Sequence, residues 1–244
     1  MDLIIGPEPP VNSGLSEGSL TMTARRQGGV SHFAVETFVA TTGSALNWVC
    51  EKLKWFADAR EISALAATVH ASQGVTFVPA LTGLRVPQME AAARASLTGV
   101  SMATTQAEVA YAILEGIAHS VTSCIEADEA VSGVRVSELV VGGGLSCSDP
   151  LLQIQADLIG IPIRRMQESD RASLRGIAYL AGSSGLLWPS LHDACKTIAT
   201  DAVFQPAIGV AERARRRALW HARVGSELGH VRQFKQEKEE ALHK

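Results

Sequence analysis

Apolar positions change from a short continuous run to a helical spacing within one segment, residues 138–160. The run Leu139–Val141 is typical of a buried strand that is covered on both faces. Three glycines follow at 142–144, and apolar residues then recur with helical periodicity over 151–159. The pattern therefore predicts a strand, a glycine turn and a helix in direct succession.

Polar residues and a proline mark the two ends of this helix. Ser146, Ser148 or Asp149 can cap its N-terminus, Pro150 suits its first turn, and Gly160 ends it. A helix N-terminus behind a glycine turn favours an anion and lets a ligand approach the backbone, as in nucleotide sites. The segment matches neither G-x-G-x-x-G nor the Walker A pattern, so a tight turn without a ligand remains the alternative.

The N-terminal part of the chain is rich in Gly, Pro and Ser over residues 1–29. We expect an irregular lead-in there, with short edge strands at 3–5 and 19–24, and not the beginning of a domain. Alternation over 30–38 predicts a strand, and a helix capped by Thr41 or Thr42 then runs to about residue 56.

Two residues on one face of that helix are candidates for contact with a ligand. Gly43 lies in its first turn, where a small residue lets a ligand approach, and Asn47 follows one turn later. A second helix is predicted over 61–70, a strand over 75–80 and a loop over 81–97.

A capping box, Thr105 with Glu108, begins a long helix that Gly133 closes. After the glycine turn and its helix, the pattern predicts further elements. They are a strand over 161–166, a helix dense in small residues over 172–187 that packs on a sheet, a short helix over 192–198, and a last helix from about 210 that frays into a charged tail.

This order of elements is that of an α/β protein in which helices cover a mixed sheet. The 244 residues carry 46% hydrophobic and 19% charged side chains, which is ordinary for one soluble domain. The net charge of −3 gives no reason to expect a nucleic acid or membrane partner. Residues 211–244 carry nine basic and five acidic side chains, which we interpret as a solvated face.

The four cysteines are isolated in sequence, without a C-x-x-C pair or a histidine at metal spacing. This distribution fits a reducing, cytoplasmic compartment. Cys147 lies in the glycine turn, but no base accompanies it in the pattern, so it is interpreted as a bystander. No apolar run reaches the 18 residues of a membrane span.

Three acids lie near the candidate site, and each has a structural interpretation. Asp149 is expected to cap a helix or to lie as an acid in its first turn, and Asp157 is expected to lie at the surface or to cap a helix. Glu115 interrupts an apolar stretch, so it is expected to be buried with Arg94 or Ser120 as a partner. The sequence therefore predicts no catalytic residue and no metal site, but a place to hold a nucleotide.

Two motifs connect the chain to a known family. The sequence A-S-L-T-G-V at 95–100, followed after seven residues by E-V-x-x-A-I-L-E at 108–115, matches a signature pattern of the FGGY family of carbohydrate kinases at every defined position. Residues 77–83, 151–160 and 178–182 support the match. Over residues 6–224 the chain resembles the C-terminal half of that family, and the run 153–157 favours its glycerol kinase branch.

The resemblance implies a ribonuclease H-like, actin-like ATPase lobe that holds the adenine side of ATP between two lobes, with Mg²⁺ in the whole enzyme. Gly43 and Gly144 match nucleotide-contacting glycines, and Gly143 belongs to the same turn. Ser148 stands where glycerol kinases have Asn, and Asn47 where relatives have Gln. The implied lobe spans 30–224, with a charged helical tail over 225–244.

The sequence also departs from the family. Glycerol kinases have Asp-Gly-Gly where this chain has three glycines, and the loop 85–91 has changed character. The resemblance implies that the family's N-terminal lobe, with its first phosphate loop, most of the polyol pocket and the catalytic Asp, lies outside the matched residues, and that the Gly-Thr-Gly phosphate hairpin belongs just upstream of Leu3. We therefore expect the given residues alone to lack the positioning and the proton acceptance that phosphoryl transfer needs.

We therefore expect the ATP/ADP-binding lobe of a kinase for a polyol or sugar hydroxyl, inactive by itself. An N-terminal lobe would act as its partner in cis or trans, and apolar surface left exposed without that partner would promote self-association into a homo-oligomer. The alternative is a non-catalytic nucleotide-binding or interaction module derived from this family. A generic actin-like ATPase of another branch is a lesser alternative.

Overall fold

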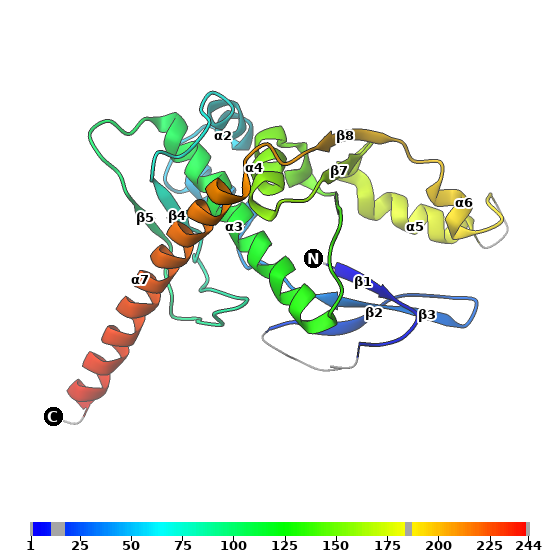
Figure 1. The fold of residues 1–244 in the computed structure, drawn as a ribbon, viewed down its shortest axis with the longest axis horizontal. Helices are drawn as coiled ribbons and strands as arrows, with labels where there is room; N and C mark the ends of the chain where they lie inside the picture. Colours follow the sequence, from blue (N-terminus) through cyan, green and yellow to red (C-terminus); the bar gives the residue numbers. More distant parts are fainter. Residues whose placement is uncertain (1, 11–17, 184–186, 243–244) are drawn as a thin grey trace.

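The computed structural model describes residues 2–10, 18–183 and 187–242, which form three small sheets and their covering helices (Figure 1). In chain order the elements are β1 (Asp2–Gly6), β2 (Leu20–Gln27), β3 (Val30–Glu36), α1 (Gly43–Glu51), α2 (Ala59–Ala66), β4 (Thr76–Val78), β5 (Ser96–Thr98), α3 (Gln106–Ser132), β6 (Leu139–Val141), η1 (Gly144–Cys147), α4 (Asp149–Ile159), β7 (Ile163–Met166), η2 (Ser169–Arg171), α5 (Ala172–Gly182), α6 (Leu191–Cys195), β8 (Thr200–Phe204) and α7 (Val210–Leu242).

The first sheet is antiparallel, with the strand order β1-β3-β2. Gly28 and Gly29 make the turn between β2 and β3 with φ values of 56° and 82°, a conformation that glycine adopts without strain. The edge strands predicted at 3–5 and 19–24 are confirmed as β1 and β2, which lie on either side of β3 and are longer than predicted. The predicted boundary between residues 29 and 30 falls inside this hairpin.

Helix α3 is the central element, and its ends are those that the sequence predicts. Thr105 accepts a hydrogen bond from the Glu108 amide, and the Glu108 side chain accepts one from the Thr105 amide at 2.7 Å. Gly133 ends the helix in the left-handed conformation, with a φ of 70°. The helix spans 27 residues and lies against the first sheet, α2, α4 and β4.

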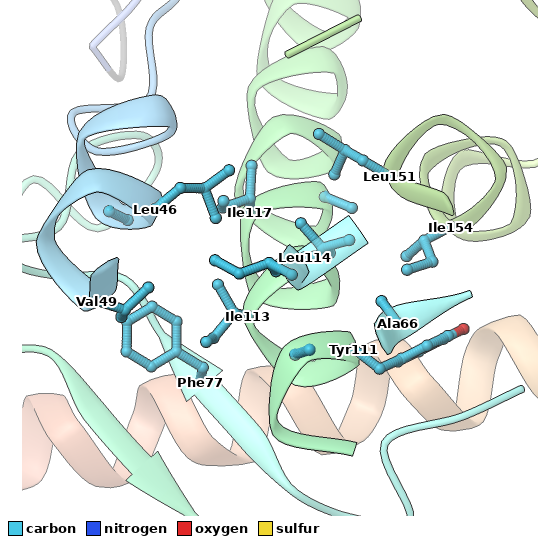
Figure 2. Packing of buried hydrophobic residues seen from close by; sticks show 14 of the residues in the cluster. Leu46, Val49, Ala66, Phe77, Tyr111, Ile113, Leu114, Ile117, Leu151 and Ile154 are labelled. Atoms are coloured by element: carbon cyan, nitrogen blue, oxygen red, sulfur yellow. The ribbon is translucent and has the colours of Figure 1, made fainter. Parts of the chain in front are cut away.

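The main hydrophobic core surrounds the N-terminal half of α3. Ile113, Leu114 and Ile117 are at most 1% exposed. Figure 2 shows Leu46 of α1 on one flank of α3 and Leu151 of α4 on the other. The two helices that carry the candidate site residues are therefore held by one core.

Helix α1 is shorter than predicted and ends at Glu51 instead of about residue 56. Thr42 occupies the predicted N-cap position, but its side chain makes no capping hydrogen bond within the described chain. Thr41 is buried and donates its hydroxyl proton to the Pro79 carbonyl, which fixes the start of α1 against the end of β4.

The third sheet is mixed: β6 pairs with β7 in parallel, and β7 pairs with β8 antiparallel. The sequence did not predict β8. The interpretation of Leu139–Val141 as a strand covered on both faces was wrong, because Val140 is 59% exposed. No described element covers that face of the strand.

The predicted packing of the small-residue helix on a sheet was wrong as well. Helix α5 extends away from α3 together with α6 (Figure 1). Leu174 and Ile177 are each 68% exposed, so α5 presents apolar side chains outward.

Helix α7 is only in part the solvated basic helix that the charge pattern predicted: residues 232–241 are exposed, but one face of the preceding turns is buried. Trp220 is 3% exposed and stacks on His119 of α3 with ring centroids 4.9 Å apart. Arg217 is buried and donates to the His119 carbonyl oxygen at 3.2 Å. Burial lowers the pKa of His119 well below its ordinary value, so the stacked imidazole is neutral.

The predicted boundary between 224 and 225 falls inside α7, which continues without a break. Val231 is buried at 6% exposure, and Lys235 pairs with Glu90 at 2.8 Å. None of the described helices combines the length and the apolarity that a bilayer crossing requires.

Candidate functional site

The glycine turn connects β6 to α4 through the short helix η1. Gly143 has a φ of 90°, which a residue with a Cβ rarely adopts. Ser148, one of the three predicted candidates, is the N-cap of α4, and its hydroxyl accepts from the Leu151 amide at 3.4 Å. Asp149 lies in the first turn of α4, which is one of the two predicted places, and it pairs with Arg165 at 2.6 Å.

Hydrogen bonds from the next segment hold the turn in shape. The Gly143 amide donates to the Ser169 carbonyl at 2.7 Å. The Ser146 hydroxyl, which is buried, lies 2.6 Å from both the Gly143 carbonyl and the Ser169 hydroxyl. Arg165 donates to the Ser146 carbonyl at 2.9 Å. The turn is therefore pre-organised by this chain's own residues.

The glycines at the turn differ in what surrounds them. A Cβ placed on Gly142 would lie 2.7 Å from the Cβ of Ala172, so packing against α5 requires that glycine. Apart from the neighbouring residues of its own turn or helix, a Cβ placed on Gly143 or Gly144 would meet no described atom within 4 Å, and the same holds for Gly43. Three of the candidate residues thus have open space where their Cβ would be.

The second group of candidates lies on α1. Gly43 is the first residue of that helix, and Asn47, one turn later, is exposed to solvent. Because Leu46 and Leu151 pack on opposite flanks of α3, the structure places this group and the glycine turn on two sides of one helix (Figure 2).

Helix α2 links the two groups through a residue that the sequence did not indicate. Helix α2 contacts both α1 and α4. The hydroxyl groups of Ser63 and Ser148 lie 2.7 Å apart and share a hydrogen bond. A serine in the middle of an amphipathic helix gives no sequence signal for such a contact, so Ser63 was missed.

A cleft of about 620 Å³ lies beside the turn, on the side of β7 and α5. Its lining includes Asp149, Arg165, Tyr179 and Asp201, but not Gly144 or Ser148. Burial lowers the pKa of the Arg165 guanidinium, but its hydrogen bonds to Asp149 and Asp201 outweigh that effect and the net shift is upward. The paired Arg165 therefore acts as a structural cation in the wall of the cleft.

The predicted partners of Glu115 were wrong. Glu115 is buried and accepts a hydrogen bond from the Ser72 hydroxyl at 2.9 Å and one from Arg216 of α7 at 3.3 Å. Ser120 instead donates to the Gly116 carbonyl at 2.9 Å. Burial raises the pKa of Glu115, and the bonds from Ser72 and Arg216 oppose that shift.

Asp157 is buried, whereas the sequence led us to expect it at the surface or as a helix cap. It is 7% exposed and accepts hydrogen bonds from the Gln153 side chain at 3.0 Å and from the Ala207 amide at 2.7 Å. Both acids therefore connect α7 and its preceding loop to the body of the lobe. Within the described ranges, no group of three or more His, Cys, Asp or Glu residues is arranged to hold a metal ion.

Comparisons with known proteins agree with the fold and the motifs. Residues 5–185 match the model of the FGGY family of carbohydrate kinases, C-terminal domain. The chain is 36% identical to the glycerol kinase of Deinococcus radiodurans over 205 residues, which cover 84% of this chain and 41% of that protein. It is 39% identical to the glycerol kinase of Citrifermentans bemidjiense over 221 residues, or 88% of this chain and 43% of that protein.

Solved structures give the same result. The Plasmodium falciparum glycerol kinase with ADP superposes with a TM-score of 0.79 and 28% identity, over 87% of this chain and 42% of that one. A gluconate kinase from Lactobacillus acidophilus superposes with a TM-score of 0.69 over 93% of this chain and 44% of that one, at 24% identity. These matches confirm the predicted α/β, actin-like ATPase fold.

The chain spans about two fifths of the length of the glycerol kinases that it matches. The family model covers most of the chain, and the described fold carries the signature segment at the start of its central helix. The protein therefore belongs to the FGGY family of carbohydrate kinases, and the matched region is that family's C-terminal domain.

Proposed function

We propose that this chain is the C-terminal, nucleotide-binding lobe of a glycerol kinase-like enzyme, which transfers a phosphoryl group from ATP to a polyol or sugar hydroxyl. The observation that carries the proposal is the pre-organised turn at Gly143 and Gly144. Both glycines face open space, and the N-terminus of a helix follows. The similarity to glycerol kinases supports it.

In this proposal each candidate residue has a stated task. Gly143 and Gly144 let the nucleotide lie directly against the backbone, and Gly43 does the same on α1. Ser148 and Asn47 offer hydrogen bonds to the base or ribose, with Ser63 holding the Ser148 hydroxyl in place. Mg²⁺ would neutralise charge on the phosphates of the bound nucleotide, and we assign it no ligand in this chain.

The lobe alone is expected to bind nucleotide without turning it over. Phosphoryl transfer needs a base at the acceptor hydroxyl and groups that position the phosphates, and we assign neither role to a residue of this chain. An N-terminal lobe, in cis or in trans, would supply them. The four unpaired cysteines support a cytoplasmic location for such an enzyme.

Calorimetric titration of the purified chain with ADP, and with ATP and Mg²⁺, tests the proposal. We expect saturable binding by the wild type. The variant Gly144→Val should weaken binding at least about tenfold, or about 1.4 kcal/mol, because its side chain would fill the space left for the ligand. The matched control is Gly225→Ala on α7, where an added Cβ also meets no described atom and which should bind like the wild type.

Two substitutions at Ser148 separate its roles. Ser148→Asn keeps a helix cap and a hydrogen-bonding group, so affinity should be retained. Ser148→Ala loses the cap and the contact with Ser63, so it should weaken both binding and stability. Absence of binding by the wild type, or equal affinity of Gly144→Val, would contradict the proposal.

A further inference from the structure

A second cleft, of about 260 Å³, lies between α3, the N-terminal part of α7 and the loop that precedes β4. Its volume is just below the range of about 300–1,000 Å³ that is usual for drug-sized ligands, so it suits a smaller molecule. Ala112 and Gly116 of α3 lie in its wall, and these two small residues, one turn apart, make room for a ligand. The residues assigned to the nucleotide site are all described, and none of them lines this cleft.

His119 lines the cleft and has a hydrogen-bond donor that no described residue uses. Its imidazole is 3% exposed and neutral. Arg217, which is outside the cleft lining, approaches the ring nitrogen Nδ1 to 3.3 Å. Because a guanidinium can only donate, Nδ1 accepts and the single proton of the neutral ring is on Nε2. This N–H has no acceptor within the described chain, and a buried donor without an acceptor is destabilising until a ligand supplies one.

The Thr76 hydroxyl is a second polar group without a partner among the described residues. Side chains alternate along β4, so Phe77 packs into the main core, whereas Thr76 and Val78 face α7. Thr76 lines the cleft at 8% exposure, and its hydroxyl makes no hydrogen bond with a described residue. A ligand in the cleft can therefore reach a hydroxyl that the fold leaves unused.

The charged groups at and next to the cleft balance one another. Arg215 and Arg216 both donate to Glu212. Each oxygen of the Glu115 carboxylate accepts one hydrogen bond, so each retains a lone pair for a further donor. An added anion would face this carboxylate, and an added cation would face the two guanidinium groups. The cleft therefore favours a neutral ligand whose groups both donate and accept, and closely spaced hydroxyls meet that requirement.

We propose that the cleft between α3 and α7 is a binding site for a neutral polyhydroxylated molecule, a polyol or a monosaccharide, separate from the nucleotide site. One ligand hydroxyl would accept from the Nε2–H of His119, a second would bond with Thr76, and a third would donate to Glu115. Leu219 and the ring of Trp220 supply apolar surface for the carbon chain. The inference goes beyond the proposed function and does not depend on it.

NMR titration of the chain with three matched ligands tests the chemical class. Sorbitol is neutral, gluconate carries a carboxylate at one end, and glucamine carries an ammonium group at one end. We expect sorbitol to saturate the site with a Kd below about 10 mM, and each charged ligand to bind at least about fivefold more weakly. The imidazole C–H signal of His119, assigned by its loss in His119→Gln, should move along the same saturation curve.

Matched substitutions show whether sorbitol binds in this cleft. Thr76→Val keeps the branched shape, so it should weaken sorbitol binding roughly threefold to tenfold, the effect of one hydrogen bond, without lowering the melting temperature. Thr98 pairs with Thr76 across β4 and β5, lies outside the cleft lining, and has a buried hydroxyl that is likewise without a partner among the described residues. Thr98→Val is therefore the control and should bind sorbitol like the wild type. Gly144→Val should also bind sorbitol normally, so failure of this site and failure of the nucleotide site are distinguishable.

Four results would overturn the inference. Failure of sorbitol to saturate the chain would mean that the cleft is not a polyol site. Tightest binding by gluconate or by glucamine would show that the cleft selects a charge. Equal sorbitol affinity of Thr76→Val and the wild type would place the binding elsewhere. A marked loss of stability in Thr76→Val would show that the hydroxyl has a partner within the protein and is not free for a ligand.

Discussion

Asp128, in the C-terminal half of α3, can be used to test how burial changes the pKa of a carboxylate and the stability of this lobe. Its side chain is 1% exposed. One carboxylate oxygen accepts from the Thr37 hydroxyl at 3.0 Å, and the other is buried without a hydrogen-bond partner among the described residues. Burial raises the pKa of Asp128 from 3.8 to about 7, against the opposing effect of the Thr37 hydrogen bond.

The direction of the pH effect follows from that shift. Because the pKa is higher in the folded state, the folded protein binds more protons than the unfolded one between pH 3.8 and about pH 7. Stability therefore falls as the pH rises through this window. A difference of about three between the folded and unfolded pKa corresponds to about 4 kcal/mol in the free energy of unfolding. The folded protein has lost this stabilisation in full once the pH is well above 7.

The substitution Asp128→Asn removes the charge and keeps an oxygen that can accept from Thr37. At pH 8 the variant should be more stable than the wild type by up to about 4 kcal/mol, and at pH 5 by roughly 1.5 kcal/mol. Urea unfolding followed by circular dichroism at pH 5, 6, 7 and 8 measures the difference. Asp170→Asn, at an exposed carboxylate, is the control and should show no such trend.

The reasoning is refuted if the stability difference between Asp128→Asn and the wild type is the same at every pH. That result would mean that the carboxylate is solvated or paired in solution. A difference that grows toward low pH would show that the charged form is the stabilised one, which is the opposite of what burial predicts.

Three further substitutions test the packing around α3, each by urea unfolding. Gly116→Ala would place a Cβ 2.0 Å from the Phe77 carbonyl oxygen, so it should cost more than about 2 kcal/mol; a neutral effect would contradict the close packing of α3 on β4. Trp220→Ala removes the ring stacked on His119 and should cost about 3–5 kcal/mol, whereas a loss below about 1 kcal/mol would mean that α7 is not docked. Thr105→Ala breaks the capping box and should cost about 1 kcal/mol, and an unchanged stability would show that the cap does not form.

The features that the sequence predicted correctly are those that depend on neighbours within a few residues. The capping box of Thr105, the left-handed Gly133 and Gly160, and the Ser148 cap each involve backbone groups less than five positions away. Such contacts are encoded in the local pattern, so the pattern reveals them.

The features that it missed depend on residues far away in the chain. Glu115 pairs with Arg216, which is 101 positions later, and neither residue type nor spacing connects the two. Asp157 likewise accepts from the Ala207 amide, 50 positions later. The sequence also failed to predict which apolar faces are buried. Helical periodicity identifies an apolar face on α5, but it does not reveal that no described element packs against that face.

The candidate site shows the same division. The sequence marked three consecutive glycines and could not rank them, because the reason for each glycine lies in its surroundings. In the structure Gly142 is required for close packing against Ala172, whereas Gly143 and Gly144 face open space. Only the two uncovered glycines offer a ligand the close approach that the motif implies.

One core supports both halves of the proposed nucleotide site, and this has a consequence for how variants should be interpreted. Leu46 of α1, the helix that begins at Gly43, and Leu151 of α4, the helix that Ser148 caps, pack into the same cluster with Ile117 of α3. A substitution in that cluster would disturb the two halves together, so it should lower stability and nucleotide affinity in parallel. A Cβ added at Gly144 meets no described atom beyond its own chain neighbours, so a substitution there should lower affinity alone. The separation of these two responses distinguishes a residue that touches the nucleotide from one that supports the site.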